Sequence, residues 1–470
     1  MSEDFAERFG FSEQHRALAR RDEEAILGWR FLPKIIFEGG EGVFVIDVDG
    51  NRYYDMSSGM MSMVIGHAHP ELVETIREQA DKLIHQASWY SNPWSIEYTE
   101  LVASTLPGDL NQMNYAVTGS EANEVAMRMA IGSSGKFELV SLLRGLHGGT
   151  LAVESLTTVG GARRSNLGPL MIPAARNALL SPSCYRCPIN LKYPECDVAC
   201  IEASAERLEH LSTKEVAAIM AETIQVPGGM NVPPAEYMPR LKRLAERWDA
   251  LLILDEAQLA PGRTGKMWGF EHYDVVPDIV TFGKGMSAGM AITGAVTTPA
   301  IAEQSKGKAG IPWAGTYSSD PLPAAVALKQ LQIVIRDDLT GKAAKLGAFL
   351  RGRLEQLQQR FAFVGDVRGL GLYQMMDIVE DRQTKTPDFV TAERIRFNAI
   401  SEGLLLLTSR NCIRLVPPLT ITEAELDDVV GRLETALQKT VDGEPRGIDL
   451  DAAYDVSSSL AHRKESRRAG

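Results

Sequence analysis

The chain has 470 residues, of which 44% are hydrophobic, so it is long enough for more than one domain and apolar enough to fold as a globular protein. Its 61 acidic and 49 basic residues give a net charge of −12, which argues against nucleic acid or an anionic membrane as a partner. The sequence has no apolar stretch of membrane-spanning length, and its acidic start has no secretory pattern. We therefore expect a cytoplasmic protein.

The first expected element is a β-hairpin, formed by Gly42–Asp47 and Arg52–Asp55 around the turn Asp49-Gly50. Further along, apolar runs alternate with helical patterns such as Glu121–Ala130 and Glu236–Trp248. Several runs are almost continuously apolar, which is typical of strands covered on both faces, so the pattern predicts an α/β domain with a mostly parallel sheet. The expected strands are Met113–Thr118, Phe137–Leu142, Val216–Ala221, Leu251–Asp255, Ile279–Phe282 and Thr293–Thr297.

The C-terminal part of the chain mixes long helices with strands, which predicts a smaller α+β domain. We expect an N-terminal segment (1–65) that packs on the small domain, a large domain (66–312), the small domain (313–442) and a loose, charged tail (443–470). The helices expected in this part are Leu322–Arg336, Leu339–Phe361 and Glu423–Val441, and the strands lie within Gly365–Met376 and Cys412–Val416.

Two charged residues stand at the ends of apolar runs. Asp255 ends the run that starts at Leu251, and Lys284 follows Ile279–Phe282 between two glycines. Open α/β sheets bind ligands at this carboxyl edge, and lysine is rarely buried without a partner or a role. For either residue alone, an exposed ion pair at a strand end is the simpler explanation.

A third feature places Gly119 and Ser120 where a strand ends and a helix begins. Backbone N–H groups at a helix N-terminus bind phosphate, although a plain helix cap explains the same residues. Pyridoxal phosphate (PLP) uses all three features, because it needs a lysine that forms a Schiff base, a carboxylate beside the pyridine nitrogen, and a phosphate site. The combination predicts a PLP enzyme in which Lys284 carries the cofactor and Asp255 pairs with the ring.

Several ordered motifs resemble class III (omega-type) PLP-dependent aminotransferases, and the resemblance runs from about Ile36 to Gln438. The motifs shared with the family are Thr118-Gly-Ser-Glu-Ala-Asn-Glu124, His147-Gly148, Glu222, Asp255-Glu-Ala-Gln258, Gly262-Arg-Thr-Gly265 and Lys284-Gly-Met286. Further motifs resemble the 2,2-dialkylglycine decarboxylase-like branch, namely Ser58-Gly59, Gly66-His-Ala-His-Pro70, Ser319-Asp-Pro-Leu-Pro-Ala-Ala325, Gly365-Asp-Val-Arg-Gly369 and Arg414-Leu-Val-Pro-Pro-Leu419.

The resemblance implies the PLP-dependent transferase fold type I, with a mostly parallel seven-stranded sheet in the large domain. It also implies a homodimer or homotetramer with the active site at a subunit interface. Within that site, Gly119 and Ser120 would hold the cofactor phosphate, and Thr316 would reach it from the other subunit. Gln258 would bond the ring oxygen, while Asp255 would pair with the pyridine nitrogen.

The resemblance also assigns residues around the ring and the substrate. Leu146 and His147 would lie against the cofactor, with Glu222 nearby to balance an arginine when an uncharged substrate end is bound. Arg414 would clamp the substrate carboxylate in a two-pronged contact, although a surface ion pair is the simpler explanation for that residue. Met60 would face the substrate.

Two departures from the family pattern bear on chemistry. Leu146 replaces the aromatic residue that normally stacks on the ring, so stacking is weakened or supplied elsewhere, with Trp89 and Tyr90 as candidates. Met60 and Pro227 replace the glutamine and the serine of the decarboxylase branch. Neither residue offers a side-chain donor to a departing carboxylate, which disfavours decarboxylation.

A third departure is an insertion in which Cys184, Cys187, Cys196 and Cys200 lie close together. Four such thiols could bind zinc or an iron–sulfur cluster. Their spacing fits no common zinc module well, so we expect a reduced structural or redox-sensitive loop without a metal.

From these residues and the resemblance we expect an aminotransferase that moves an amino group from an amine or amino acid to a 2-oxo acid through the Lys284 aldimine. A decarboxylase, racemase or lyase on the same scaffold is the alternative. A nicotinamide oxidoreductase would need a G-x-G-x-x-G turn after an early strand, which we do not find there. A cysteine-cluster regulatory protein without catalysis would lack the cofactor residues, whereas Lys284, Asp255 and Ser120 are all present.

Overall fold

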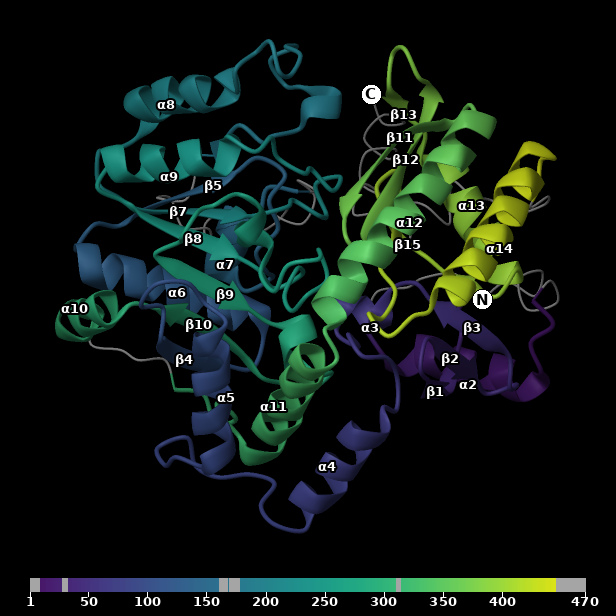
Figure 1. Cartoon of the computed structure of the whole chain (residues 1–470), viewed down its shortest axis with the longest axis horizontal. Coiled ribbons are helices and arrows are strands. Elements are labelled where there is room, and N and C mark those ends of the chain that lie inside the picture. The colour runs from purple at the N-terminus through teal and green to yellow at the C-terminus, as the bar shows by residue number, and fades with distance from the viewer. Residues whose placement is uncertain (1–8, 28–32, 160–167, 169–177, 310–313, 445–470) are drawn as a thin grey trace. The chain divides into compact units, whose positions relative to one another are not determined.

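A computed structural model describes residues 9–27, 33–159, 168, 178–309 and 314–444. The chain divides into two compact units (Figure 1). The large unit comprises 60–64 and 70–344, and the small unit comprises 1–59, 65–69 and 345–470. In the described part of the chain, no helix has the length and apolarity needed to cross a lipid bilayer.

A seven-stranded sheet forms the centre of the large unit. The strand next to one edge is antiparallel to both of its neighbours, and the pairs that follow it across the sheet are parallel. The prediction of a mostly parallel seven-stranded sheet is therefore confirmed. In spatial order the strands are β4 (Gln112–Ala116), β10 (Thr293–Thr297), β9 (Ile279–Phe282), β8 (Leu251–Asp255), β7 (Val216–Glu222), β5 (Glu138–Leu142) and β6 (Ala178–Leu179).

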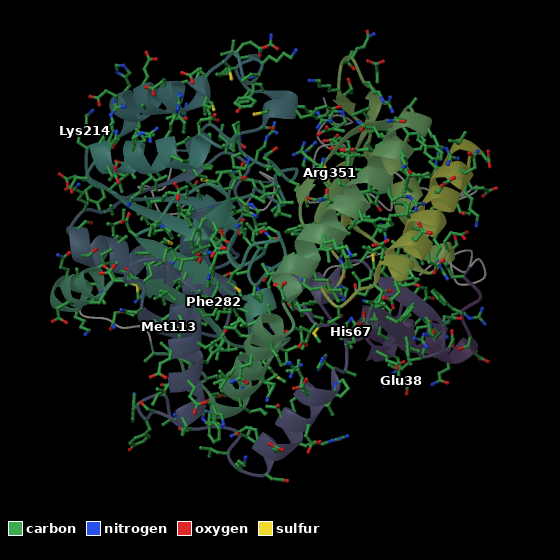
Figure 2. The ribbon with its side chains drawn as sticks, in the orientation of Figure 1. Glu38, His67, Met113, Lys214, Phe282 and Arg351 are labelled. Carbon is green, nitrogen blue, oxygen red and sulfur yellow. The ribbon has the colours of Figure 1, made fainter. Side chains whose placement is uncertain are left out.

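Helices cover both faces of this sheet, which explains why its strands are apolar on both sides. One face packs on α6 (Gly119–Ser134) and α7 (Leu151–Leu156), and α10 (Pro299–Ala309) lies against α6. The other face packs on α5 (Pro93–Ser104), α8 (Ala199–Leu211), α9 (Tyr237–Arg247) and α11 (Pro321–Arg336). Phe282 lies inside this second layer (Figure 2), edge-on to Tyr98 and Trp268 at ring-centroid distances of 6.3 and 6.4 Å.

The small unit is an α+β unit built from both ends of the chain. Its first sheet joins β1 (Phe37–Glu41), β2 (Phe44–Asp47) and β3 (Arg52–Asp55) to β14 (Leu404–Leu405), which runs parallel to β3. Its second sheet contains β11 (Val364–Leu370), β12 (Tyr373–Asp381), β16 (Cys412–Leu415) and β15 (Leu407–Ser409), with β13 (Thr386–Pro387) beside β12. The helices are α2 (Glu13–Ala25), α13 (Phe389–Ser401), α14 (Glu423–Val441) and most of α12 (Leu339–Arg360).

The boundary between the units differs from the expected one at residue 313. Residues up to 344 belong to the large unit, because α11 packs against α5 and against α4 (Pro70–Ala80). The N-terminal residues belong to the same unit as the C-terminal domain. Of the expected tail, 445–470 lie outside the described residues.

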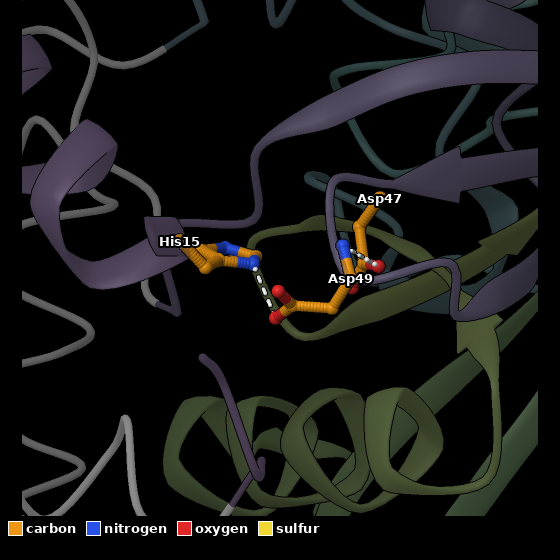
Figure 3. Close-up of side chains that lie close together, drawn as sticks. All are labelled: His15, Asp47 and Asp49. Carbon is orange, nitrogen blue, oxygen red and sulfur yellow. Dashed lines mark hydrogen bonds and ion pairs between the residues drawn. The ribbon is translucent and has the colours of Figure 1, made fainter. Parts of the chain in front are cut away.

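Polar side chains link α2 to the hairpin of β2 and β3 (Figure 3). His15 Nδ1 contacts Asp49 Oδ2 at 3.1 Å, and the Ile36 backbone N–H donates to His15 Nε2 at 3.1 Å. Together with Asp47, these side chains form the one group among the described residues whose His, Cys, Asp or Glu ligand atoms lie close enough for a metal ion.

Hydrogen bonds already occupy the carboxylate of Asp47. It accepts from the backbone N–H groups of Asp49 and Asn51 at 3.0 and 2.9 Å, from Asn51 Nδ2 at 3.0 Å and from the Tyr53 hydroxyl at 2.9 Å. Each carboxylate oxygen of Asp47 thus accepts two hydrogen bonds. We therefore interpret this group as a hydrogen-bond network that stabilises the hairpin and not as a metal centre.

Replacing Asp47 with alanine should lower the free energy of unfolding by roughly 2–4 kcal/mol, because it leaves several buried donors without an acceptor. Urea denaturation followed by circular dichroism measures this change. The matched control is Glu38→Ala on the exposed side of β1 (Figure 2), which should change stability by less than about 0.5 kcal/mol. Equal effects of the two substitutions would contradict the role given to Asp47.

Candidate active site

The N-terminus of α6 forms one end of the candidate site. Thr118 caps the helix, and a capping box with Glu121 satisfies donors on both sides of the helix start. The box leaves Gly119 and Ser120 in the first turn, facing the pocket, where the helix dipole favours an anion.

The turn at Gly148 fits closely around Ser120. Gly148 has a φ of +147°, and a Cβ atom there would lie only 2.4 Å from Ser120 Oγ. The Gly149 backbone N–H donates to the same oxygen at 3.0 Å. This glycine turn and the helix N-terminus together form a polar cradle that a larger residue would fill, which is the geometry a phosphate group needs.

Lys284 lies at the end of β9 in an unusual backbone conformation. Its φ is +43°, a region that non-glycine residues rarely adopt. The glycines on either side are required by packing, because a Cβ at Gly283 would lie 3.1 Å from Thr293 and one at Gly285 would lie 2.6 Å from the Ala260 carbonyl. Backbone strain of this kind is typical of functional sites, and Lys284 lines the same pocket as Ser120.

Asp255 at the end of β8 is buried but ionised. Burial opposes its charge, yet a bond to His147 Nδ1 at 3.0 Å, the Asn123 Nδ2 donor at 2.9 Å and the Ala257 N–H at 3.1 Å hold its pKa below the usual value. The other nitrogen of His147, Nε2, is buried without a hydrogen-bond partner among the described residues. The pocket therefore contains a fixed negative charge and an unsatisfied polar atom, both of which a polar aromatic cofactor would suit.

A second carboxylate, Glu222, lies in the same pocket, and its pKa is shifted in the opposite direction, above the usual value. Burial, together with the charge of Asp255, raises the pKa of Glu222 to about 7 despite the favourable charge of His147. Its oxygens accept from the Leu146 backbone N–H at 2.9 Å and lie 3.5 Å from Gln258 Nε2. Glu222 thus holds the backbone at Leu146 in place. With a pKa of about 7, its carboxyl group is partly protonated near neutral pH.

Most of the residues expected in the cofactor site line this one pocket. They are Gly119, Ser120, Leu146, His147, Glu222, Asp255, Gln258 and Lys284. The other expected residues do not line it in the described part of the chain.

Those other residues lie in varied surroundings. Thr316 is exposed in a turn, and Met60 is 49% exposed in the single-turn helix α3 (Ser58–Met61). Arg414 is buried on β16 of the small unit, and its Nε has no hydrogen-bond partner among the described residues. Trp89 and Tyr90, the candidates for ring stacking, are 87% and 68% exposed and absent from the described lining of the pocket.

Two residues of this network, Asn123 and Thr281, were not predicted from the sequence as site residues. Asn123 donates to Asp255 and to the His147 carbonyl at 2.6 Å, and its own oxygen accepts from the Thr281 hydroxyl on β9 at 2.6 Å. One signal was available, because Asn123 follows Ser120 by three positions and so lies on the same side of α6.

The mostly parallel seven-stranded sheet, with a lysine, a buried carboxylate and a polar cradle at its carboxyl edge, matches fold type I of the PLP-dependent transferases. The chain matches the family model "Aminotransferase class-III" over residues 30–437. It therefore belongs to the class III aminotransferase family, and the sequence-based assignment is confirmed.

Curated relatives of this chain include both aminotransferases and racemases. The acetylornithine aminotransferase of Caldanaerobacter subterraneus subsp. tengcongensis is 33% identical over 415 residues, which cover 86% of this chain and 95% of that protein. The leucine/methionine racemase of Thermococcus litoralis is 32% identical over 407 residues, covering 85% and 92%. Among solved structures, a PLP-bound amine transaminase from an uncultivated Pseudomonas species is 31% identical with a TM-score of 0.83, covering 88% of this chain and 97% of that one.

Stability of the cofactor-free chain should depend on pH through Glu222. Because its folded pKa of about 7 lies above the ordinary 4.5, the folded state loses stability as the pH rises from 4.5 to about 7. Glu222→Gln removes this titration, so the difference in unfolding free energy, variant minus wild type, should grow by on the order of 3 kcal/mol across that window. Chemical denaturation at a series of pH values measures it.

The matched control is Glu97→Gln, which makes the same substitution at an exposed position of α5 outside the pocket. A flat difference for Glu222→Gln would contradict the raised pKa.

Proposed function

We propose that the chain holds PLP covalently on Lys284 and transfers an amino group from an amine or amino acid to a 2-oxo acid. The observation that carries the proposal is that Lys284, Asp255 and the Ser120 cradle line a single pocket. The same pocket contains the buried His147 Nε2, which has no hydrogen-bond partner among the described residues and is consistent with a ligand that completes the site.

The residues of the pocket suit the parts of the cofactor one by one. The N-terminus of α6 with Gly119 and Ser120 suits the phosphate, and Gln258 suits the ring oxygen. Asp255, held ionised, suits a protonated pyridine nitrogen, which lets the bound ring accept electrons from a substrate Cα bond. Leu146 offers an apolar cover to one face of the ring but no π system.

In this proposal Lys284 does the proton transfer as well as the binding. Lys284 would hold the cofactor through its side-chain amine, and the same amine, when free, would move the substrate Cα proton as a general base and acid. Arg414 supplies the carboxylate clamp for substrates that have one. Its buried Nε without a partner among the described residues supports a role in binding an anion.

We further propose that the enzyme is a cytoplasmic homodimer or homotetramer. Thr316 is exposed in its own chain, which is compatible with a role in the phosphate site of a neighbouring subunit. Partners are then the amine or amino acid and the 2-oxo acid, with neither nucleic acid nor membrane involved.

Racemisation is the second candidate function, and it rests on the racemase relative at 32% identity. A racemase needs the same pocket, since it also removes the Cα proton, but it returns that proton to the opposite face of the substrate. The two activities differ in their need for an oxo acid. An aminotransferase consumes it, whereas a racemase interconverts amino-acid enantiomers without it.

Reduction of the purified protein with borohydride should fix one cofactor per chain to Lys284. Peptide mapping by mass spectrometry identifies the labelled lysine. Lys284→Arg should lose the label and more than about 10³-fold of the activity, because the variant lacks both the attachment point and the base. The matched control is Lys242→Arg, whose lysine pairs with Asp278 elsewhere in the large unit and should leave the label unchanged. A label on another lysine would refute the assignment.

The purified enzyme should transfer an amino group to a 2-oxo acid and release little carbon dioxide from 2-aminoisobutyrate. Loss of carbon dioxide requires donors that hold the departing carboxylate perpendicular to the ring. Met60 has no donor, and Pro227 lacks even a backbone N–H. Labelled carbon dioxide, amino-acid product and enantiomeric ratio measured in one reaction separate the alternatives. Rapid carbon dioxide release would favour the decarboxylase, and inversion without an oxo acid would favour the racemase.

A further inference from the structure

Four of the five cysteines surround one small apolar pocket in the large unit. Cys184 lies in the turn η4 (Cys184–Arg186), and Cys187 follows it directly. Cys196 lies in the turn before α8, and Cys200 lies in the first turn of that helix. All four thiols are free of disulfide bonds; Cys184 is exposed and the other three are partly buried. The fold therefore gathers the whole cysteine set of the insertion at a single place.

Sulfur is the main metal-binding atom that this pocket offers. Its described lining otherwise consists of prolines, aliphatic side chains, two serines and Tyr193, with neither histidine nor carboxylate among them. Nearby carboxylates have other partners, since Asp197 pairs with Arg240 and Glu236 accepts from the Tyr193 hydroxyl at 3.2 Å. An all-thiolate donor set selects zinc, copper(I) or iron–sulfur clusters over hard cations.

Cysteine sulfur binds a metal as the thiolate, so a metal centre held by these four residues would form with release of their thiol protons.

The backbone between Cys196 and Cys200 adopts a costly conformation. Asp197 and Val198 are successive residues with φ of +44° and +55°. For a β-branched residue such as Val198 the left-handed region costs about 1–2 kcal/mol. Conformations of this kind persist where the surroundings hold them, and ligand sites are a common case.

The spacing of the sulfur atoms distinguishes between thiophilic metals. Within the described residues, no three of these thiols have sulfur atoms that all lie within 4.8 Å of one another. A single tetrahedral zinc ion would bring its four sulfurs to separations of about 3.8 Å. A cubic four-iron cluster holds its ligand sulfurs on the order of 6 Å apart, which is compatible with a wider ring of thiols around a pocket.

We propose that Cys184, Cys187, Cys196 and Cys200 ligate a [4Fe–4S] cluster. The proposal departs from the expectation from sequence of a metal-free loop, which was based on the cysteine spacing. The cluster is a structural one. The loop that it closes reaches the segment before Leu146, because Arg144 Nη1 donates to Ser183 Oγ at 2.8 Å and Gln225, bonded to Ser181, donates to the Leu143 carbonyl at 3.0 Å.

The test uses the full chain with its cofactor, purified without oxygen and incubated with ferric iron, sulfide and dithiothreitol, which reduces the part of the iron that the cluster holds as ferrous ions. Iron and acid-labile sulfide are then counted per chain after desalting, because cluster and cofactor absorb in overlapping regions. We expect about four of each. Cys187→Ser and Cys196→Ser should lose both, whereas Cys412→Ser, at the buried fifth cysteine on β16, should keep both.

A second readout needs no variant. In the reconstituted wild type the four cysteines should resist alkylation by iodoacetamide, and removing the iron with a chelator should expose them. A parallel sample receives zinc alone. One tightly held zinc without labile sulfide would overturn the cluster, as would alkylation of all four cysteines to the same extent before and after reconstitution.

Discussion

The arrangement of side chains at the carboxyl edge of the large sheet depends on the buried charge of Asp255. An ionised carboxylate removed from water costs several kcal/mol unless donors surround it. Its donors come from three separate segments: His147 from the loop after β5, Asn123 from α6, and the Ala257 N–H from the turn after β8. The charge therefore persists only while the helix, the loop and the strand end keep their relative positions.

The same network fixes the remaining parts of the site. Asn123 also binds the His147 carbonyl and the Thr281 hydroxyl, so α6 is held against β9, the strand that carries Lys284. The residue after His147 is the glycine whose lack of a side chain makes room for Ser120. Carboxylate, lysine and phosphate cradle are thus positioned by one set of hydrogen bonds, and disturbing any member moves the others.

The sequence predicted the elements well where a local pattern determines them. The predicted first and last residues match the observed ones for β8, β9, β10 and α14, because apolar runs mark the ends of the strands and a capping box marks the start of the helix. The two-residue strand β6 was not foreseen, since so short a run carries no periodicity. The membership of α11 in the large unit depends on its packing against α4 and α5, which is a tertiary contact. Asn123 was missed because nothing in its own identity shows which carboxylate it meets.

Two carboxylates in one pocket behave differently because their donors differ. Asp255 receives two side-chain hydrogen bonds and a backbone one and keeps its charge, while Glu222, next to that charge, holds its proton up to about pH 7. In the proposed function all of these contacts would hold or polarise the cofactor. They would not by themselves select which substrate bond is broken or where the Cα proton returns. Amino transfer and racemisation can therefore share this network, so the choice between them would depend on residues that contact the substrate.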